Sequence, residues 1–293
     1  MMKPHECSPQ KNLYRRIDSF IPPKAKESTV AIVLIHGAVL HQFGTGTLFR
    51  IADHSFLVTA AHVVEEARKY EGLCIPTADG SFVQIHGKWI CSSKGQYGTA
   101  TDLFDIAVLR LSSSTVVRLD DESFLRLDGI GFNEDLSSGI FCLFGYPALW
   151  SQPSTDENIR LKAKLLQYTT YAFEGSTETL PEYQARFHLL LNAGLVGSTD
   201  IEGSPVLFCD RSDTTAEFPR GLSGISGCSV WLIGNKNKPL HDWSCEEAKI
   251  VAVQTGVYHD RQIIQATRWI AVSTLLYQAF PELRPAMVLW RVS

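Results

Sequence analysis

The chain has 293 residues, of which 45% are hydrophobic and 20% are charged, a composition typical of a globular protein that can bury a sizeable core. Its 27 Lys and Arg against 31 Asp and Glu give a net charge of -4, and no long basic run occurs, so the sequence argues against a nucleic-acid-binding protein. The most apolar run, TVAIVLIHGAVL at residues 29–40, contains a histidine and is too short to span a bilayer.

The N-terminal stretch and the cysteines bear on where the protein acts. Residues 1–28 are polar and lack the apolar core of a secretory signal, so we expect them to lie as an extension over the surface. The seven cysteines are widely scattered with no Cys-Xaa-Xaa-Cys, a spacing that suits neither a zinc site nor a disulfide framework. We therefore expect free thiols, a cytoplasmic location and no membrane partner.

Most of the chain from residue 29 onward has the pattern of short β-strands. Runs rich in Val, Ile, Phe and Thr alternate with Gly, Pro, Asp and Ser, as expected where a barrel turns its corners. The first set is TVAIVLIHG, GTGTLFRI, HSFLVTA, FVQIHGKWI and DIAVLRL, and the second set is GIFCLFGYP, AKLLQYTTYAF, ARFHLLLNA, CSVWLIG and KIVAVQTGVY.

Two stretches are predicted to be helical. AAHVVEEARKY at residues 60–70 is typical of a short helix, and TRWIAVSTLLYQAF at residues 267–280 has apolar residues at helical spacing. The second stretch places four large side chains on one face, namely Trp269, Val272, Leu276 and Phe280.

Together these elements predict an all-β protein of two packed antiparallel β-barrels with a C-terminal helix. The boundaries expected from the sequence are a polar extension at 1–28, a first barrel at 29–140, a second barrel at 141–265, and a helix and tail at 266–293.

One histidine stands where a catalytic base could be positioned. A hydroxyl nucleophile is weak until a base removes its proton, and that base needs a third group to orient it. His62 follows Thr59-Ala60-Ala61 at the corner where a strand gives way to a helix, and these small residues leave room around the imidazole. The histidines in or beside strand-like runs are interpreted as structural or surface groups: His36, His41, His54, His86 and His188.

The carboxylate that could orient this histidine is sought at the mouth of a strand. Asp105 opens the strand DIAVLRL. An Asp in this position is often a turn or cap residue, but a carboxylate held there could also fix the tautomer of an imidazole. Asp102 is the alternative and lies in more loop-like sequence. We favour Asp105.

Two serines share one Gly-Xaa-Ser-Gly frame in PRGLSGISGCSVWLIG, Ser223 and Ser226. Either could be the nucleophile on this pattern alone, because small residues are common in loops. Ser204 also precedes a strand, but Pro follows it, so we interpret EGSPVLF as a turn before a strand.

The three stretches TAAHV, DIAVLRL and GISGCSVW, in the order His, Asp, Ser, resemble the trypsin-like (chymotrypsin-fold) serine peptidases. The pattern of that family is Thr-Ala-Ala-His, Asp-Ile-Ala-Leu-Leu and Gly-Xaa-Ser-Gly-Gly. The Gly-Tyr-Pro of FCLFGYP also looks like a strand of bacterial and intracellular members. The resemblance extends over residues 29–280.

The resemblance implies a serine endopeptidase with its site in the cleft between two β-barrels. His62 would act as general base and then acid, and Asp105 would hold its ring. In that fold the nucleophile is followed by Gly and then directly by a buried strand, which selects Ser226 over Ser223. The N–H groups of Gly224 and Ser226 would form the oxyanion hole, where Gly permits close approach of the backbone.

The sequence departs from the secreted, zymogen-type members of the family. Those members carry a Cys after the His and an Asp before the nucleophile, where this chain has Val63 and Ile225. Cys228 replaces the second Gly after the nucleophile. Activation by cleavage and an ion pair is therefore not expected, and the site is either formed constitutively or ordered by a regulatory protein partner.

Substrate specificity rests on a few positions. Arg220, six residues before Ser226, would lie near the floor of the primary pocket and favour acidic side chains; the alternative is an exposed Arg in a polar loop. The strand around Thr255 and Gly256 would form one wall and pair with the backbone of a protein or peptide substrate.

Other function classes fit the sequence less well than a peptidase does. An α/β-hydrolase needs Gly two residues after the serine and the order Ser, acid, His, and neither condition is met. FGTGTLF lacks the Lys-Ser/Thr and helix of a phosphate-binding loop. No metal or cofactor is predicted. A catalytically silent binding module with the protease fold remains the alternative.

Overall fold

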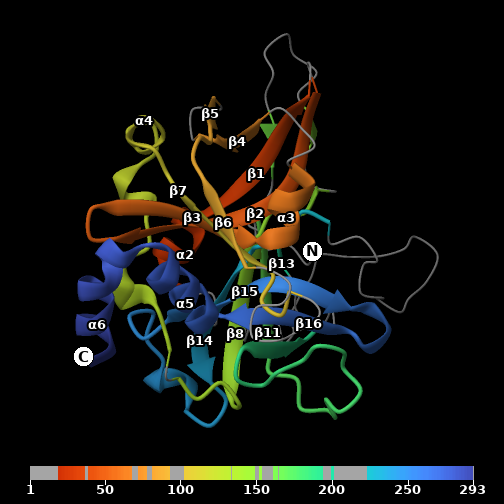
Figure 1. The fold of residues 1–293 in the computed structure, drawn as a ribbon. Helices are drawn as coiled ribbons and strands as arrows, with labels where there is room; N and C mark the ends of the chain where they lie inside the picture. The colour runs from red at the N-terminus through yellow and green to blue at the C-terminus, as the bar shows by residue number, and fades with distance from the viewer. Residues whose placement is uncertain are drawn as a thin grey trace, which may run out of the picture.

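Two seven-stranded antiparallel sheets, one from each half of the chain, make up most of the structure (Figure 1). The computed structural model describes residues 19–36, 39–67, 72–77, 81–92, 102–132, 134–148, 152–153, 161–163, 165–193, 199–200 and 223–292.

The first sheet has the order β5-β4-β1-β2-β3-β7-β6 and forms the red-to-yellow upper part of Figure 1. Its centre is the long meander β1-β2-β3, in which β2 pairs with both neighbours. Its strands are β1 (Thr29–His36), β2 (Val39–Ile51), β3 (His54–Ala60), β4 (Leu73–Pro76), β5 (Phe82–Gln84), β6 (Trp89–Cys91) and β7 (Ile106–Arg110).

The second sheet has the order β12-β16-β15-β14-β8-β11-β13. A bridge between Ala172 and Leu191 joins the chain just after β11 to β12 at the edge of the sheet, so the sheet curls back on itself. Its strands are β8 (Gly139–Gly145), β11 (Leu166–Tyr171), β12 (His188–Asn192), β13 (Thr199–Asp200), β14 (Ser229–Asn235), β15 (Lys249–Tyr258) and β16 (Ile263–Arg268). The short pair β9 (Gln152–Pro153) and β10 (Leu161–Lys162) forms a separate ribbon.

Few α-helices accompany the sheets within the ranges given above. They are α2 (Pro23–Glu27), α3 (Ala61–Ala67), α4 (Ser113–Val116), α5 (Trp269–Ala279) and α6 (Arg284–Val292). No helix of the described residues is long and apolar enough to cross a membrane. The predicted all-β fold of two packed antiparallel sheets with a C-terminal helix is confirmed, each sheet being curled as a half-barrel.

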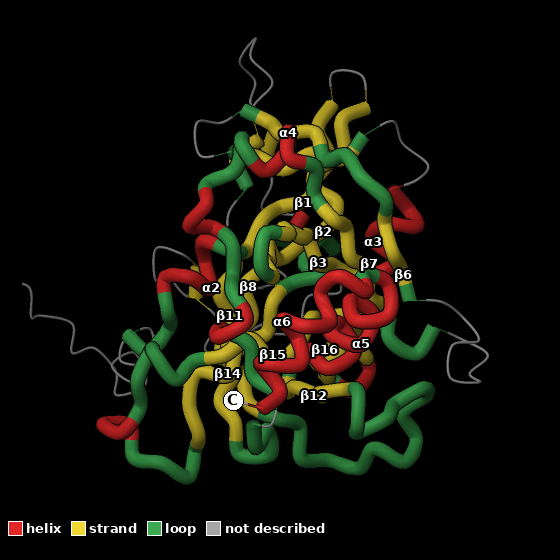
Figure 2. The backbone as a smooth tube through the Cα atoms, turned by 60° about the vertical axis from the view of Figure 1, so that its left-hand side comes forward, coloured by secondary structure: helices red, strands yellow, loops and turns green. Residues whose placement is uncertain are grey.

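Aromatic side chains from both sheets and from α5 form one shared core. Phe49 and Phe56 from the first sheet and Phe144 and Trp231 from the second belong to the same buried cluster as Trp269 of α5. The rings of Phe49 and Trp269 meet edge to face with centroids 5.5 Å apart. Since α5 contacts β7 of the first sheet as well as β15 and β16 of the second (Figure 2), it ties the two sheets together.

The structure corrects several expected boundaries. The run FVQIHGKWI forms two strands rather than one, because Gly87 adopts a φ of +150° at a position where a Cβ would lie 2.6 Å from the carbonyl oxygen of Arg110. The helix expected from residue 267 begins at Trp269, because the preceding Thr267 and Arg268 pair with β15. The sequence pattern does not predict the strand β16, because its short apolar run leads directly into the helix.

We expect Trp269→Ala to lower the free energy of unfolding by about 3–5 kcal/mol, because it opens a large cavity between the sheets. Trp269→Phe should cost less, since the indole N–H is buried without a hydrogen-bond partner in the described part of the chain and its removal relieves that penalty. Urea unfolding measures both changes. A loss below about 1 kcal/mol for Trp269→Ala would contradict the central place of this side chain.

Candidate active site

His62 is placed by the junction between β3 and α3. Ala60 ends the strand and Ala61 begins the helix, and both are buried against the sheet. The backbone N–H of Ala61 donates to the carbonyl oxygen of Asp105 at 2.9 Å, which joins this corner to the start of β7. The imidazole is 46% exposed, so one of its edges is accessible from solvent.

Asp105 holds His62 through both oxygens of its carboxylate. Oδ1 accepts from the backbone N–H of His62 at 2.8 Å, and Oδ2 accepts from Nδ1 at 2.6 Å. Because a carboxylate can only accept, Nδ1 carries the proton and Nε2 is left as the basic nitrogen. The pair therefore has the geometry of a base whose tautomer and ring orientation are both fixed.

The backbone of Asp105 adopts a conformation that non-glycine residues seldom occupy. Its φ is +50°, in the left-handed region, which persists only where surrounding contacts determine it. One such contact is made by Asp102, which accepts from the N–H of Phe104 at 3.1 Å and from the hydroxyl of Ser92 at 2.7 Å. Of the two carboxylates considered from sequence, Asp105 meets His62 and Asp102 braces the loop.

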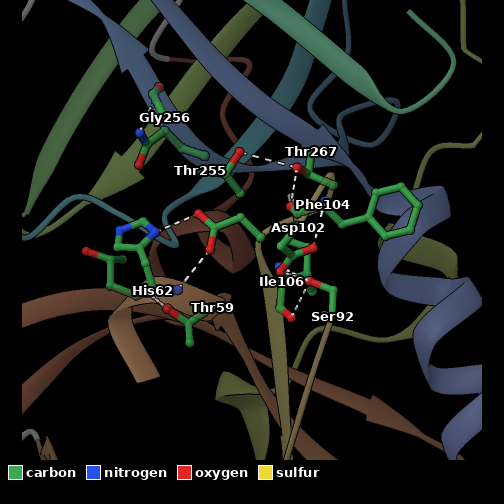
Figure 3. A network of polar contacts seen from close by, with 12 residues as sticks. Thr59, His62, Ser92, Asp102, Phe104, Ile106, Thr255, Gly256 and Thr267 are labelled. Carbon is green, nitrogen blue, oxygen red and sulfur yellow. Dashed lines mark hydrogen bonds and ion pairs between the residues drawn. The ribbon is translucent and has the colours of Figure 1, made fainter. Parts of the chain in front are cut away.

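The second sheet also holds this loop. His188 Nε2 lies 2.8 Å from the carbonyl oxygen of Leu103, and the Thr267 hydroxyl donates to the carbonyl oxygen of Phe104 at 2.6 Å. His188 and Thr267 are register partners on β12 and β16. The Thr267 hydroxyl also lies 3.2 Å from the hydroxyl of Thr255, so Thr255, Thr267 and Phe104 form one chain of hydrogen bonds (Figure 3). The sequence interpretation of His188 as a structural group gave no sign of this contact with the loop before Asp105.

The charge of Asp105 raises the pKa of His62. Burial is the largest single effect and lowers this pKa. The hydrogen bond to Asp105 and its negative charge, together with the charges of Glu66 and Glu65 on the same helix, outweigh burial and raise the pKa above its ordinary value of 6.5. The protonated ring is therefore stabilised in the folded protein.

The pKa of His188 moves in the opposite direction. This side chain is 3% exposed, and burial lowers its pKa more than the bond to Leu103 and the charge of Glu182 raise it. Its Nδ1 accepts from the N–H of Gln184 at 3.0 Å. Both nitrogens of the neutral ring therefore have hydrogen-bond partners. A proton on Nδ1 would place its N–H against the N–H of Gln184.

Gly227 brings the serine loop against the strand that leads to His62. Its φ is +86°, and a Cβ there would lie 2.1 Å from Thr59 Oγ1 and 2.9 Å from the N of Ala60. Only glycine allows this approach. The carbonyl oxygen of Ser226 meanwhile accepts from the N–H of Thr45 at 2.9 Å. Ser226 therefore lies beside the last residues of β3, while Ser223 is exposed at the start of the loop.

Ser226 and His62 come from the two sides of this contact. Among the residues that the structure describes, no hydrogen bond joins Ser226 Oγ to His62 Nε2. In proteins without substrate such catalytic hydrogen bonds are often long and tighten on binding.

The backbone N–H groups of Gly224 and Ser226 donate to no described residue. Gly224 has a φ of +94°, and a Cβ would lie 2.6 Å from the N of Ala148 and 2.8 Å from the carbonyl oxygen of Tyr146. These two donors, two residues apart on one tight loop, can bind an oxyanion.

The residues expected to contact substrate are placed only in part. Arg220 and Ser204 lie outside the described residues. The hydroxyl of Thr255 faces inward to Thr267, so its backbone rather than its side chain is available to a ligand. β15 pairs with β14 only as far as Val253, and beyond Gln254 no described strand covers the edge that contains Gly256. The described residues contain no cluster of three or more His, Cys, Asp or Glu that could hold a metal ion.

Comparison with protein-family models and with curated proteins finds no match. Solved structures similar to this chain include a Glu endopeptidase in complex with MPD, at 14% identity and a TM-score of 0.46, with 89% of this chain and 93% of that chain covered.

Two further similar structures are the serine protease domain of the Sesbania mosaic virus polyprotein and the MamO protease domain of Magnetospirillum magneticum. The first is 14% identical with a TM-score of 0.41, covering 85% of this chain and 91% of that chain. The second is 8% identical with a TM-score of 0.41, covering 86% and 97%. At these identities the likeness concerns the fold, and the assignment of the site depends on its own geometry.

We expect the His62 imidazole to titrate above pH 6.5 and Asp105→Asn to lower its pKa, since burial and the charges of Glu66 and Glu65 then act without the hydrogen bond and charge of Asp105. The folded protein binds the His62 proton more tightly than the unfolded chain, so this stabilisation is lost as the pH rises through the raised pKa. NMR titration of the His Cε1–Hε1 signals, assigned with His62→Gln, measures both values. A wild-type midpoint at or below 6.5 would contradict the effect of Asp105.

His188 should make stability depend on pH with the opposite sign. Between its lowered pKa and 6.5 the unfolded chain binds the extra proton, so the free energy of unfolding falls as the pH drops through that window. His188→Gln keeps one donor and one acceptor but does not titrate, so the part of the fall due to this residue should disappear. Urea unfolding at several pH values compares the two, with the exposed His41→Gln as control. Equal slopes for wild type and His188→Gln would rule out this role.

Proposed function

We propose that this protein is a serine endopeptidase that cleaves a peptide bond in a protein substrate through an acyl-enzyme. The observation that carries the proposal is the pair of hydrogen bonds that His62 donates to the Asp105 carboxylate, at 2.8 and 2.6 Å, directly beside the loop of Ser226. A carboxylate that orients an imidazole next to a serine is the arrangement that activates a hydroxyl nucleophile.

In the proposed reaction Ser226 Oγ attacks the scissile carbonyl while His62 Nε2 takes the hydroxyl proton. Asp105 stabilises the imidazolium that forms. The N–H groups of Gly224 and Ser226 bind the oxyanion. His62 then gives the proton to the leaving amine, and the acyl-enzyme remains. A water molecule, deprotonated by the same His62, hydrolyses the ester and restores the free serine.

The open edge of β15 supports the choice of an extended peptide as substrate. Past Gln254 the strand keeps β16 on one side, while its other edge is uncovered among the described residues. An extended segment can add to such an edge through main-chain hydrogen bonds. Thr255 and Gly256 would then lie beside the residues that precede the scissile bond.

Incubation of the wild-type protein with a fluorophosphonate, followed by peptide mass spectrometry, should place a single adduct on Ser226. Ser226→Ala should abolish this adduct. It should also lower hydrolysis of fluorescein-labelled casein to a residual rate that is roughly 10³–10⁴-fold above that of the uncatalysed reaction in water. Asp105→Asn should lower kcat by about 10⁴-fold, because the imidazole loses its tautomer and orientation.

Ser223→Ala is the matched control, since it removes a serine from the same Gly-Xaa-Ser-Gly frame and should leave labelling unchanged. An adduct that disappears with Ser223→Ala would transfer the nucleophile to that residue. An adduct on no serine would favour a binding module with the protease fold.

A further inference from the structure

Residues 223–228, called here the nucleophile loop, have their carbonyl groups fixed one after another. The carbonyl oxygen of Ser223 accepts from the N–H of Ala148 at 2.7 Å, and that of Ile225 accepts from the N–H of Cys228 at 2.8 Å. The carbonyl oxygens of Gly224 and Ser226 both bond to Thr45, at 2.8 Å to the hydroxyl and 2.9 Å to the N–H. Four consecutive carbonyl groups are therefore held.

The fixed carbonyls determine where the N–H groups point. In a trans peptide the C=O and the N–H point in opposite directions. The bond from Ala148 to Ser223 therefore directs the N–H of Gly224 away from Ala148, and the bond within the Ile225–Cys228 turn does the same for the N–H of Ser226. A glycine could otherwise rotate its flanking peptides at little cost. Here a flip at Gly224 would break the bond to Ala148 or the bond to Thr45.

Thr45 reaches the nucleophile loop from the other sheet. It lies in β2, is completely buried, and its hydroxyl donates to Gly224 while accepting from the N–H of Tyr146 at 2.9 Å. Its own carbonyl oxygen accepts from the hydroxyl of Thr59 at 2.7 Å, three residues before His62. One residue thus links the two segments: its hydroxyl bonds to the loop of the nucleophile, and its backbone carbonyl bonds to the strand of the base.

Because residue 225 is an isoleucine, no buried ion pair is needed to order the nucleophile loop. It is 2% exposed and belongs to the apolar cluster of the second sheet together with Cys228. A carboxylate at this buried position would require a cationic partner. An isoleucine requires only the apolar surroundings that the sheet already provides.

We propose that Thr45 is a positioning residue that keeps the nucleophile loop assembled, with the N–H groups of Gly224 and Ser226 directed outward, so that the uncleaved chain is active without a separate ordering step. This regulation rests on the proposed function of the same site. In this proposal, a neutral hydroxyl of the first sheet orders the oxyanion hole.

The test compares two threonines on one strand. Thr45→Val keeps the shape of the side chain and removes both hydrogen bonds of the hydroxyl. Thr47→Val is the matched control, because Thr47 lies two residues along the same face of β2 and is equally buried, while its hydroxyl has no partner in the described part of the chain. Thr45→Ser restores a hydroxyl at the same place.

With Thr45→Val we expect the rate of fluorophosphonate labelling and the kcat for fluorescein-labelled casein to fall about 10–100-fold, with KM nearly unchanged, because oxyanion donors act mainly in the transition state. Amide hydrogen exchange across the nucleophile loop should become faster. Thr47→Val should match the wild type in all three readouts, and Thr45→Ser should recover most of the loss.

Intact-mass analysis of the labelled wild type gives a measurement that needs no variant. A fluorophosphonate adduct on the full-length, uncleaved chain supports the proposal, and labelling that appears only after limited proteolysis overturns it. Equal labelling and equal loop exchange in Thr45→Val and wild type also overturn it. If no form of the protein is labelled, yet Thr45→Val alone speeds exchange in the loop, the proposed function fails while the role of Thr45 in holding the loop stands.

Discussion

The candidate site depends on hydrogen bonds that cross from one sheet to the other. Thr45 of β2 bonds to Gly224 and Ser226 of the second half of the chain, and Thr267 of β16 bonds back to the carbonyl oxygen of Phe104 beside Asp105. Each sheet therefore orients the candidate catalytic group contributed by the other. The aromatic core shared with α5 holds the sheets in contact, and these directional bonds fix their relative position.

Two histidines on this interface show how local surroundings set charge. His62 is partly exposed and faces the carboxylate of Asp105, so its pKa is raised. His188 is buried, with a carbonyl on one nitrogen and a backbone N–H on the other, so its pKa is lowered. The base of the proposed reaction would need the first environment, and a group that braces a loop needs the second. The same side chain serves either purpose because burial and hydrogen-bond partners decide which form is stable.

Much of the fold was accessible from the sequence because the strands are bounded by glycine and polar residues and their apolar runs are short. The run HSFLVTA forms β3 over the predicted residues. Of the four residues on the predicted helix face, Trp269, Val272 and Leu276 are buried, whereas Phe280 lies just after the end of α5 and is half-buried. The failures lie where the tertiary context overrides the local pattern. Gly87 divides one expected strand through a close approach to Arg110, and β16 is held in place by its pairing with β12 and β15.

The sequence by itself determined the all-β class and the order of the histidine, aspartate and serine stretches, since each is encoded by a few adjacent residues at the end of a strand or in a loop. The sequence also favoured Asp105 over Asp102 as the partner of His62, and the structure has that contact. The tertiary structure alone decided that Thr45 and His188 hold the loops around them. The contacts of Thr45 and His188 join residues 85 and 179 positions apart. No local pattern records such a pairing, because it arises only when the two sheets close on each other and every buried carbonyl has to find a donor.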